Sequence, residues 1–430
     1  MGKTSTITIA RDAASRALAR LVPYAGQAID GSGPAGWVRI DPGEDDAHVI
    51  LTASDRDSNT LSFAVDGQAP YSAHVSGALL QRVVSLSTRE SVSVAVDGTT
   101  VTLDALLEHD GPVDDLVAAP SYGVGELVAR VSAGELVSVL RAAVYIGSGH
   151  ATSVGAHTYL YGLAGADRLD VAASDGYLFL VDQVPLAEGE TGLYKDLLVP
   201  VGKAVAKKAF ALGRSFFGGD ASIFVDGVNL IVKSGTVRIA LRICEGSDTP
   251  IPSLARYVPT ASDAFATISA SGDDWRGWVN LLRAASEWTR FSVGSAGDAA
   301  IKTERGAGKA KVDTARLDVA LDGRFLRRGA GSSVMLTQDV AAGFDLVTNG
   351  RFVDDPDDDG VIDPDGDLTA GRVAVAVATF AGQNAADNPI TGLLFTCGDN
   401  PNRRVYGAGV NAAAVGIDTA SGDATNDGQP

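Results

Sequence analysis

Three segments of the chain share one order of predicted elements, and this repetition constrains the fold more than any other feature of the sequence. Each segment opens with a short strand and an amphipathic helix whose apolar residues recur at helical spacing. Ser-Asp pairs at 54–55 and 174–175 follow equivalent strand patterns, and the 120 positions between them are the size of one small domain. The three predicted helices cover Ala10–Val22, Ser132–Tyr145 and Asp273–Ala285.

Each segment continues with a second predicted helix and then a pair of strands. In the first two segments an Asp-Gly turn, at 97–98 and 226–227, separates two alternating apolar runs, which is a strong hairpin pattern. In the third segment Ser333–Thr337 and Gly343–Val347 are expected to form this pair. The second helices are predicted over Ser76–Ser87, Val201–Gly213 and Asp322–Gly331.

These patterns predict an α+β fold of three topologically similar domains, each with two helices packed on antiparallel sheets. The expected domains cover residues 1–122, 123–260 and 261–381, the last with an acidic insertion at about 350–371. A C-terminal extension, 382–430, remains. Its segment Ile390–Cys397 has the pattern of a further strand, while Ser421–Pro430 has the polar composition of a disordered tail.

The composition is that of an ordinary soluble protein. Its 430 residues are enough for about three domains of about 150 residues each, and 45% are apolar and 20% charged. The apolar stretch at 373–381 is far shorter than the ~20 residues that a membrane span needs. Neither a secretory signal nor a CxxC or zinc-type cysteine set is present, since Cys244 and Cys397 lie far apart. We expect a cytoplasmic protein that needs no membrane.

Several stretches of the middle segment resemble the bacterial DNA polymerase III beta subunit, the sliding clamp. Val171–Phe179, followed by Pro185-Leu186, is similar to that family's Thr-Asp-Gly-His-Arg-Leu segment. Downstream, Leu241–Gly246 and Pro252–Pro259 look like its Leu-Ile-Glu-Gly and Phe-Pro-Asp-Tyr stretches. The resemblance is strong over about 125–260, fair over 5–122 and weak over 262–381.

The resemblance implies three domains of the DNA-clamp type and a protein that is not an enzyme. Members of the family are head-to-tail homodimers that encircle double-stranded DNA without regard to its sequence and tether the replicative polymerase. The residues themselves give little sign of catalysis. Ala172–Gly176 lacks one glycine of a nucleophile elbow, and the five His residues are scattered along the chain.

A ring of this type implies basic helices around its hole, although the chain as a whole carries a net charge of −18. The six predicted helices contain 13 Arg and Lys against 5 Asp and Glu, a net +8; removing these from the totals of 35 and 53 leaves 22 against 48, a net −26. Such a partition suits weak attraction of phosphates inside and repulsion outside. The alternative is that helices simply carry Arg and Lys on solvated faces. The candidate DNA-channel residues are Arg11, Arg16, Arg20, Arg82, Arg141, Lys203, Lys207, Lys208, Arg276, Arg283, Arg324, Arg327 and Arg328.

The family also has an apolar pocket on its middle domain that holds linear peptides of polymerases and clamp loaders. Here Tyr177-Leu178 replaces the family's His-Arg pair, and Leu254-Ala255 replaces Tyr-Arg. The pocket would therefore be more apolar and accept a different peptide. Ordinary core packing is the alternative for each residue, above all for Leu160 and Phe179. The pocket candidates are Leu160, Ser174, Gly176, Tyr177, Leu178, Phe179, Pro252, Arg256 and Tyr257, with Val375 and Val377 as a far wall.

The subunit contact is expected on Val101 and Leu103, which lie on a strand with the pattern of a sheet edge. The family's aliphatic partners for these residues are replaced here by Ser286-Glu287, so the contact would be more polar.

An acidic run in the third segment resembles the start of an EF-hand calcium loop. Asp355, Asp357, Asp359 and Asp363 occupy positions 1, 3, 5 and 9, with glycine at position 6. Position 12 is Gly366 rather than a bidentate Glu, and flanking helices are not evident. A solvated acidic insertion is the alternative, so no cofactor is firmly predicted.

A second class of function stays open on the sequence alone. A structural repeat protein, such as a virion or assembly component without a DNA role, would also suit the Gly- and Ala-rich composition and the acidic tail.

Overall fold

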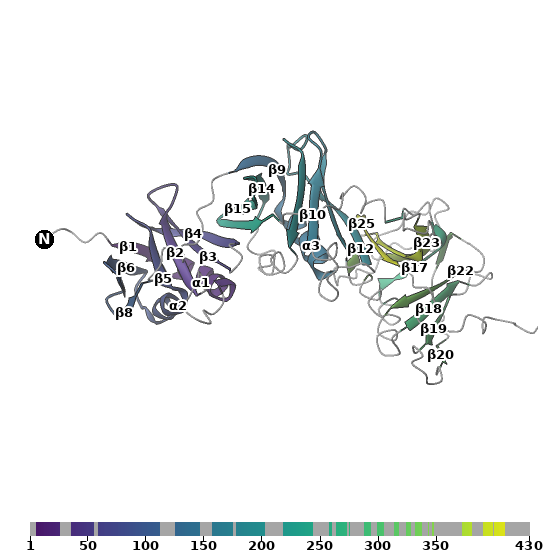
Figure 1. Ribbon diagram of the computed structural model, residues 1–430, viewed down its shortest axis with the longest axis horizontal. Coiled ribbons are helices and arrows are strands. Elements are labelled where there is room, and N and C mark those ends of the chain that lie inside the picture. Colours follow the sequence, from purple (N-terminus) through teal and green to yellow (C-terminus); the bar gives the residue numbers. More distant parts are fainter. Residues whose placement is uncertain are drawn as a thin grey trace, which may run out of the picture. The chain divides into compact units, whose positions relative to one another are not determined.

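The computed structural model describes 28 helices and strands and the turns between many of them (Figure 1). The described residues are 6–25, 36–55, 59–111, 125–146, 157–174, 178–202, 218–243, 258–259, 264–272, 275, 288–293, 299–304, 314–317, 324–327, 332–337, 343, 346–347, 372–380, 390–398 and 400–408.

The first repeat has the predicted order of elements. A strand and a helix open it, four strands and a second helix follow, and three strands close it. They are β1 (Ile7–Ala10), α1 (Arg11–Ala25), β2 (Trp37–Pro42), β3 (His48–Ser54), β4 (Thr60–Gln68), β5 (Ala73–Ser76), α2 (Gly77–Leu86), β6 (Ser91–Asp97), β7 (Thr100–Leu103) and β8 (Leu107–Asp110).

The second repeat shows the same order of strands around its first helix. Residues 203–213 of the predicted second helix lie outside the described residues, and 201–202 belong to a strand. Its elements are β9 (Glu126–Ser132), α3 (Ala133–Tyr145), β10 (His157–Gly162), β11 (Arg168–Ser174), β12 (Leu178–Pro185), β13 (Leu197–Gly202), β14 (Asp220–Val225), β15 (Asn229–Ser234) and β16 (Val237–Arg242).

The third repeat differs from the prediction in its second half. The predicted helix Asp322–Gly331 is wrong, because Arg324–Arg327 form a strand that pairs with the first strand of the repeat. Its described strands are β17 (Ala264–Ser271), β18 (Trp288–Val293), β19 (Ala299–Glu304), β20 (Thr314–Leu317), β21 (Arg324–Arg327), β22 (Ser332–Thr337), β23 (Arg372–Phe380), β24 (Ile390–Cys397) and β25 (Asn400–Ala408).

The predicted strand pair of the third repeat is also wrong. Strand β22 pairs with β18, and Gly343, Leu346 and Val347 are helical. The hairpin that follows this helix is β23–β24 instead, with β25 added next to β24. The strand predicted at Ile390–Cys397 is confirmed as β24, and it continues the sheet of the third repeat rather than standing apart from it.

The two helices of the first repeat bury their apolar stripes against its strands. Leu18 and Leu21 of α1 and Leu80 of α2 are fully buried, and α1 contacts α2, β2, β3 and β4 (Figure 1). Helix α2 lies within the predicted span Ser76–Ser87, and the two end residues of that span are its caps. The Ser76 hydroxyl accepts from the Leu79 N–H at 3.5 Å, and the Ser87 N–H donates to the Val83 carbonyl at 2.9 Å. The outer face of each helix is left for polar side chains.

The chain divides into two compact units. Unit 1 comprises Met1–Val144, Thr158–Leu169 and Val184–Gly246, and unit 2 comprises Tyr145–His157, Asp170–Gln183 and Ser247–Pro430. In unit 1 a sheet runs in the order β8-β7-β6-β1-β4-β16-β15-β14-β9, so it joins strands of the first two repeats. In unit 2 the order β12-β25-β24-β23-β17-β21 joins a strand of the second repeat to the third.

No helix among the described residues is long and apolar enough to span a membrane.

His48, the first residue of β3, makes a contribution to stability that depends on pH. The His48 ring lies 2.7 Å from Asp45 and 3.5 Å from Asp66, and its hydrogen bond with Asp45 raises the pKa of His48 and lowers that of Asp45. Because the pKa of His48 is raised, the charged histidine stabilises the fold below about pH 6.5, and this stabilisation is lost as the pH rises through the folded-state pKa. Because the pKa of Asp45 is lowered, the stabilisation from its carboxylate is lost as the pH falls below about 4.

We therefore expect amide protection in the turn between β2 and β3 to be greatest between about pH 4 and 6.5. Hydrogen exchange at 42–48, corrected for the intrinsic pH dependence, measures it. The His48→Gln variant should show a flat profile on the alkaline side, and an identical profile in both proteins would contradict the assignment.

Candidate functional site

The described helices present arginines on their outer faces. Arg16 and Arg20, one turn apart on α1, are exposed, as are Arg82 on α2 and Arg141 on α3. The buried residues of α1 and α2 face the strands, so these guanidinium groups point away from the core. Among the exposed charged residues of α1 and α2 the one acid is Asp12, and it pairs with Arg11.

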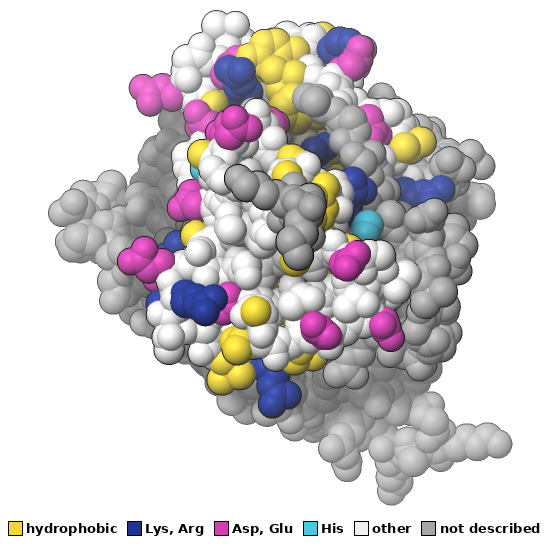
Figure 2. Space-filling model, turned by 90° about the vertical axis from the view of Figure 1, so that its left-hand side faces the viewer, with side chains coloured by type: hydrophobic (Ala, Val, Ile, Leu, Met, Phe, Trp, Pro, Cys, Tyr) yellow, Lys and Arg dark blue, Asp and Glu magenta, His cyan; other side chains and the backbone are white. Residues whose placement is uncertain are grey.

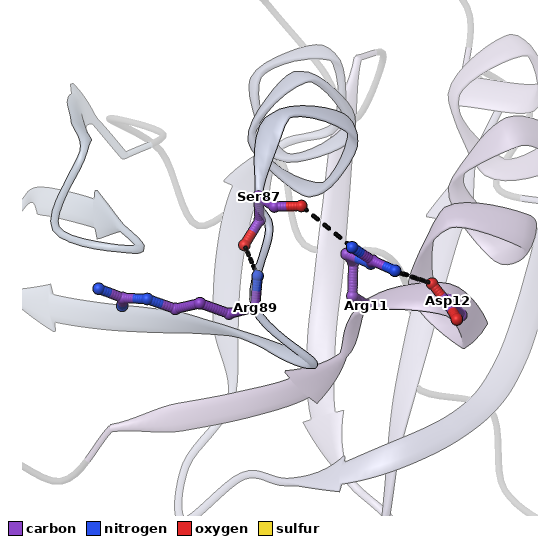
Figure 3. A network of polar contacts seen from close by, with 4 residues as sticks. All are labelled: Arg11, Asp12, Ser87 and Arg89. Carbon is purple, nitrogen blue, oxygen red and sulfur yellow. Dashed lines mark hydrogen bonds and ion pairs between the residues drawn. The ribbon is translucent and has the colours of Figure 1, made fainter.

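Arg11 is more engaged than the other helix arginines. Its guanidinium donates to Asp12 at 3.0 Å and to the Ser87 carbonyl at 3.2 Å, which joins the start of α1 to the end of α2 (Figure 3). The side chain of Arg89 in the same picture extends away from Arg11. We assign Arg11 a bridging role between the helices. Because its guanidinium already donates to Asp12 and Ser87, it is less able than Arg16 or Arg82 to bind an external phosphate.

The remaining channel candidates are not on described helices. Arg324 and Arg327 lie on strand β21, opposite Ser269 and Thr267 of β17, so the helix position predicted for them is wrong. The others lie outside the described residues: Lys203, Lys207, Lys208, Arg276, Arg283 and Arg328.

The face of the molecule in Figure 2 offers a contrast to a basic channel. Its Lys and Arg side chains stand singly among Asp and Glu side chains, and no continuous basic surface is visible there. A surface of alternating sign attracts a polyanion weakly, because neighbouring acids cancel each cation over a Debye length of about 10 Å.

The pocket candidates around β12 are mostly core residues. Leu160 on β10, Ser174 on β11, Leu178 on β12 and Val375 on β23 are at most 2% exposed. Phe179 is half-buried, and its ring lies 6.4 Å from that of Tyr406 on β25. Among the candidates whose side chains are described, Phe179 is thus the one that solvent or a ligand reaches.

The expected far wall of this pocket, Val375 and Val377, is not on the strand next to β12. Strand β12 pairs with β25, through Leu178↔Gly407 and Phe179↔Tyr406, and β24 lies between β25 and β23. Val375 and Val377 on β23 are therefore three strand spacings, about 14 Å, from β12. Gly176, Tyr177, Pro252, Arg256 and Tyr257 lie outside the described residues.

The edge of the first repeat is β8, one strand beyond the predicted one. Strand β7 lies between β6 and β8, and its Val101 and Leu103 are 2% and 0% exposed, so the edge expected for them is wrong. Leu106, which leads into β8, is 70% exposed. The sequence indicated β7 as the edge strand because its apolar residues alternate. It gave no sign of β8, whose sequence Leu-Glu-His-Asp lacks β-branched residues.

A tight turn holds β8 in place. Asp104 and Ala105 have φ angles of 49° and 53°, which are uncommon for residues other than glycine. The buried Asp104 carboxylate accepts from the Ser87 hydroxyl at 3.4 Å and from Arg89 at 3.3 Å. Ser87, which caps α2, thus helps to hold the turn that places β8 next to β7.

The edge strand directs alternate N–H groups outward. The Gly111 N–H, directly after β8, donates to the carbonyl of Thr99, directly before β7, at 2.6 Å, so the N–H groups of residues 107 and 109 point the same way, toward β7. Those of Glu108 and Asp110 consequently point away from β7. They are donors for a further strand.

A fully buried ion pair, which the sequence analysis did not identify, lies beside the β12–β25 pairing. Arg403 donates its Nε proton to the Asp182 carboxylate, and both side chains are 0% exposed. The detectable sign in the sequence was a carboxylate directly after the apolar run Leu178–Val181. The calcium candidates Asp355, Asp357, Asp359 and Asp363 lie outside the described residues, and among those described no cluster of potential metal ligands occurs.

Comparison with known proteins identifies the architecture through structure and not through sequence. No family model matches the chain, and no curated protein matches it in sequence. The DNA polymerase III beta subunit of Pseudomonas aeruginosa superposes with a TM-score of 0.70 at 11% identity, over 95% of this chain and 100% of that one. The beta subunit of Caulobacter crescentus gives 0.68 at 14% identity over the same shares, and that of Thermotoga maritima gives 0.66 at 9% identity over 94% and 99%.

Near-complete coverage of both chains at so low an identity means that the three-repeat plan is shared while the side chains are not. Together with the strand order shared by the first two repeats, it identifies the fold: this chain has the fold of the DNA polymerase III beta subunit, the bacterial sliding clamp.

Proposed function

We propose that the chain is a cytoplasmic DNA sliding clamp, a non-enzymatic ring of two copies that encircles duplex DNA. One observation carries the proposal: the same strand junction occurs twice within the chain. The fourth strand of the first repeat, β4, pairs with the last strand of the second, β16. The fourth strand of the second repeat, β12, pairs with the last strand of the third, β25.

These two junctions use two of the three fourth strands and two of the three last strands, so one strand of each type is not used. The fourth strand of the third repeat, β20, and the last strand of the first, β8, each end the described order of their sheets. If the rule of the two internal junctions is applied once more, β20 of one copy receives β8 of the next. Such a head-to-tail contact closes into a ring when its rotation divides a full turn, and otherwise continues as a filament.

The charge of the helices supports DNA as the content of the ring. Arg16, Arg20, Arg82 and Arg141 lie exposed on the described helices of the first two repeats. Such groups attract phosphates without reading bases, as a protein that slides requires. A replicative polymerase and a clamp loader would then bind through linear peptides next to the half-buried Phe179. The solved structures that share the fold include one described as a sliding clamp bound to griselimycin.

The junction predicts a specific effect of proline at the edge strand. Glu108→Pro removes one outward N–H of β8 and leaves the pairing with β7 intact, because the Glu108 N–H does not point to β7. We expect the wild type to have a mass near twice 44.1 kDa by light scattering and the variant to be a folded monomer in which β8 still pairs with β7.

The matched control is Glu108→Ala, which changes the same side chain but keeps the N–H and should leave the dimer intact. Negative-stain images of the wild type should show closed rings of six lobes. Filaments or shells would instead favour the structural repeat protein, and a dimer that survives Glu108→Pro would show that β8 is not the contact.

A further inference from the structure

A chain with three similar repeats must prevent its interchangeable strands from pairing in the wrong combination. Strands β16 and β25 are both last strands of a repeat, and both lie antiparallel to a fourth strand over four residue pairs. An exchanged pairing, β25 on β4 or β16 on β12, would satisfy the same number of backbone hydrogen bonds. Backbone geometry alone therefore does not choose between them, and side chains must.

The two junctions can be compared by matching the first paired residue of each fourth strand. Thr60↔Ala240 then corresponds to Leu178↔Gly407, and Phe63↔Val237 corresponds to Val181↔Arg404. One step further, the first junction has Ala64 and Thr236, joined by a backbone hydrogen bond of 2.8 Å.

At the same step the second junction has Asp182 and Arg403, both with 0% exposure. The Arg403 Nε donates to one carboxylate oxygen of Asp182, and its NH1 donates to the Leu346 carbonyl at 2.9 Å. The other carboxylate oxygen accepts from the Gln183 N–H at 2.8 Å. The charges of the pair are therefore matched by partners from β12, β25 and the helical residue Leu346.

Either exchange would separate the two charges. With β16 next to β12, the Asp182 carboxylate would stay on its buried strand and face Thr236 instead of Arg403. With β25 next to β4, the Arg403 guanidinium would face the half-buried Ala64 and lose its carboxylate partner. A buried charge without a counter-charge is strongly unfavourable. A matched buried pair, by contrast, often adds little net stability over apolar residues of the same size, so its effect is on discrimination between partners.

We propose that Asp182 and Arg403 are the specificity-determining pair that selects β25, and no other last strand, as the neighbour of β12. The pair thereby keeps β8 and β20 as the ends at which further copies add. The proposal concerns strand pairing within and between copies of this chain, and it holds whether or not the assembly encircles DNA.

The test replaces both charges by apolar residues of similar size in the full chain, Asp182→Leu with Arg403→Met. We expect this double variant to fold with an unfolding temperature no lower than that of the wild type. After refolding from denaturant, native mass spectrometry should show a loss of the single wild-type mass in favour of several oligomers, since exchanged junctions are no longer penalised.

The control removes a buried polar pair that joins strands of one repeat, Thr52→Val with Ser62→Ala, whose hydroxyls lie 3.0 Å apart. It should refold to the single wild-type mass. Two results would overturn the proposal: a double charge variant that refolds to the single mass as faithfully as the wild type, or one that no longer folds, which would make the pair a requirement of stability.

Discussion

A single cut in a circular plasmid should release this protein from the DNA. A closed ring is held on a circle by topology, so it remains bound at salt concentrations that abolish phosphate contacts. A protein held by six to ten phosphate contacts alone loses about 10³–10⁵ in affinity between 50 and 200 mM salt, on either topology. Retention on circles and loss from linear DNA at the same salt therefore separates encirclement from ordinary binding.

The experiment needs no loader. The protein is diluted until its dimers dissociate, concentrated again with nicked circular plasmid, and passed over a gel-filtration column at 0.5 M salt before and after cleavage by a single-cutting nuclease. The Glu108→Pro variant is the control, because it keeps the helix arginines and should be absent from the DNA fraction in both runs. Equal retention of the wild type on cut and uncut plasmid would disprove encirclement.

Removing one partner of the buried ion pair should cause the largest loss of stability of any substitution considered. Arg403→Met leaves the Asp182 carboxylate at 0% exposure without its counter-charge. Breaking a buried pair in this way costs about 3–5 kcal/mol, a large part of the 5–15 kcal/mol that is typical of a domain. Urea unfolding followed by hydrogen exchange should place the loss in β12 and β25.

The neighbouring residue supplies a matched control. Arg404 is half-buried and donates to the Pro259 carbonyl at 3.3 Å, so Arg404→Met removes one ordinary hydrogen bond, worth about 1 kcal/mol. A loss for Arg403→Met no larger than that for Arg404→Met would show that the buried carboxylate finds another partner. The loss of unfolding free energy would then come from a change in β25 itself and not from breaking the ion pair.

Local patterns in the sequence predicted most of the first two repeats. The Asp-Gly turns lie between β6 and β7 and between β14 and β15, and the serines at 76 and 87 cap α2. These features depend on residues near each other in the chain, so helical spacing, alternation and turn residues are sufficient to detect the elements.

The third repeat and the junctions depended on contacts that local patterns do not record. Residues 322–331 carry a short apolar pair among arginines, which fits a helix as well as the strand β21 that pairing with β17 produces. Strand β8 has no strand-forming residues, and its structure comes from β7. The partners Asp182 and Arg403 are 221 residues apart, so only the folded sheet places them together.

Covalent connectivity distinguishes seams that are otherwise alike. When β4 and β16 separate, the chain that links the first two repeats keeps them at an effective concentration of the order of millimolar, so they rejoin at once. In the proposed ring, the seam between β8 and β20 has no such tether, and its rejoining depends on how many protomers are present. The ring would therefore open between copies and not within one, and the lifetime of the open form would be set by protein concentration, although the backbone hydrogen bonds at every seam are of the same kind.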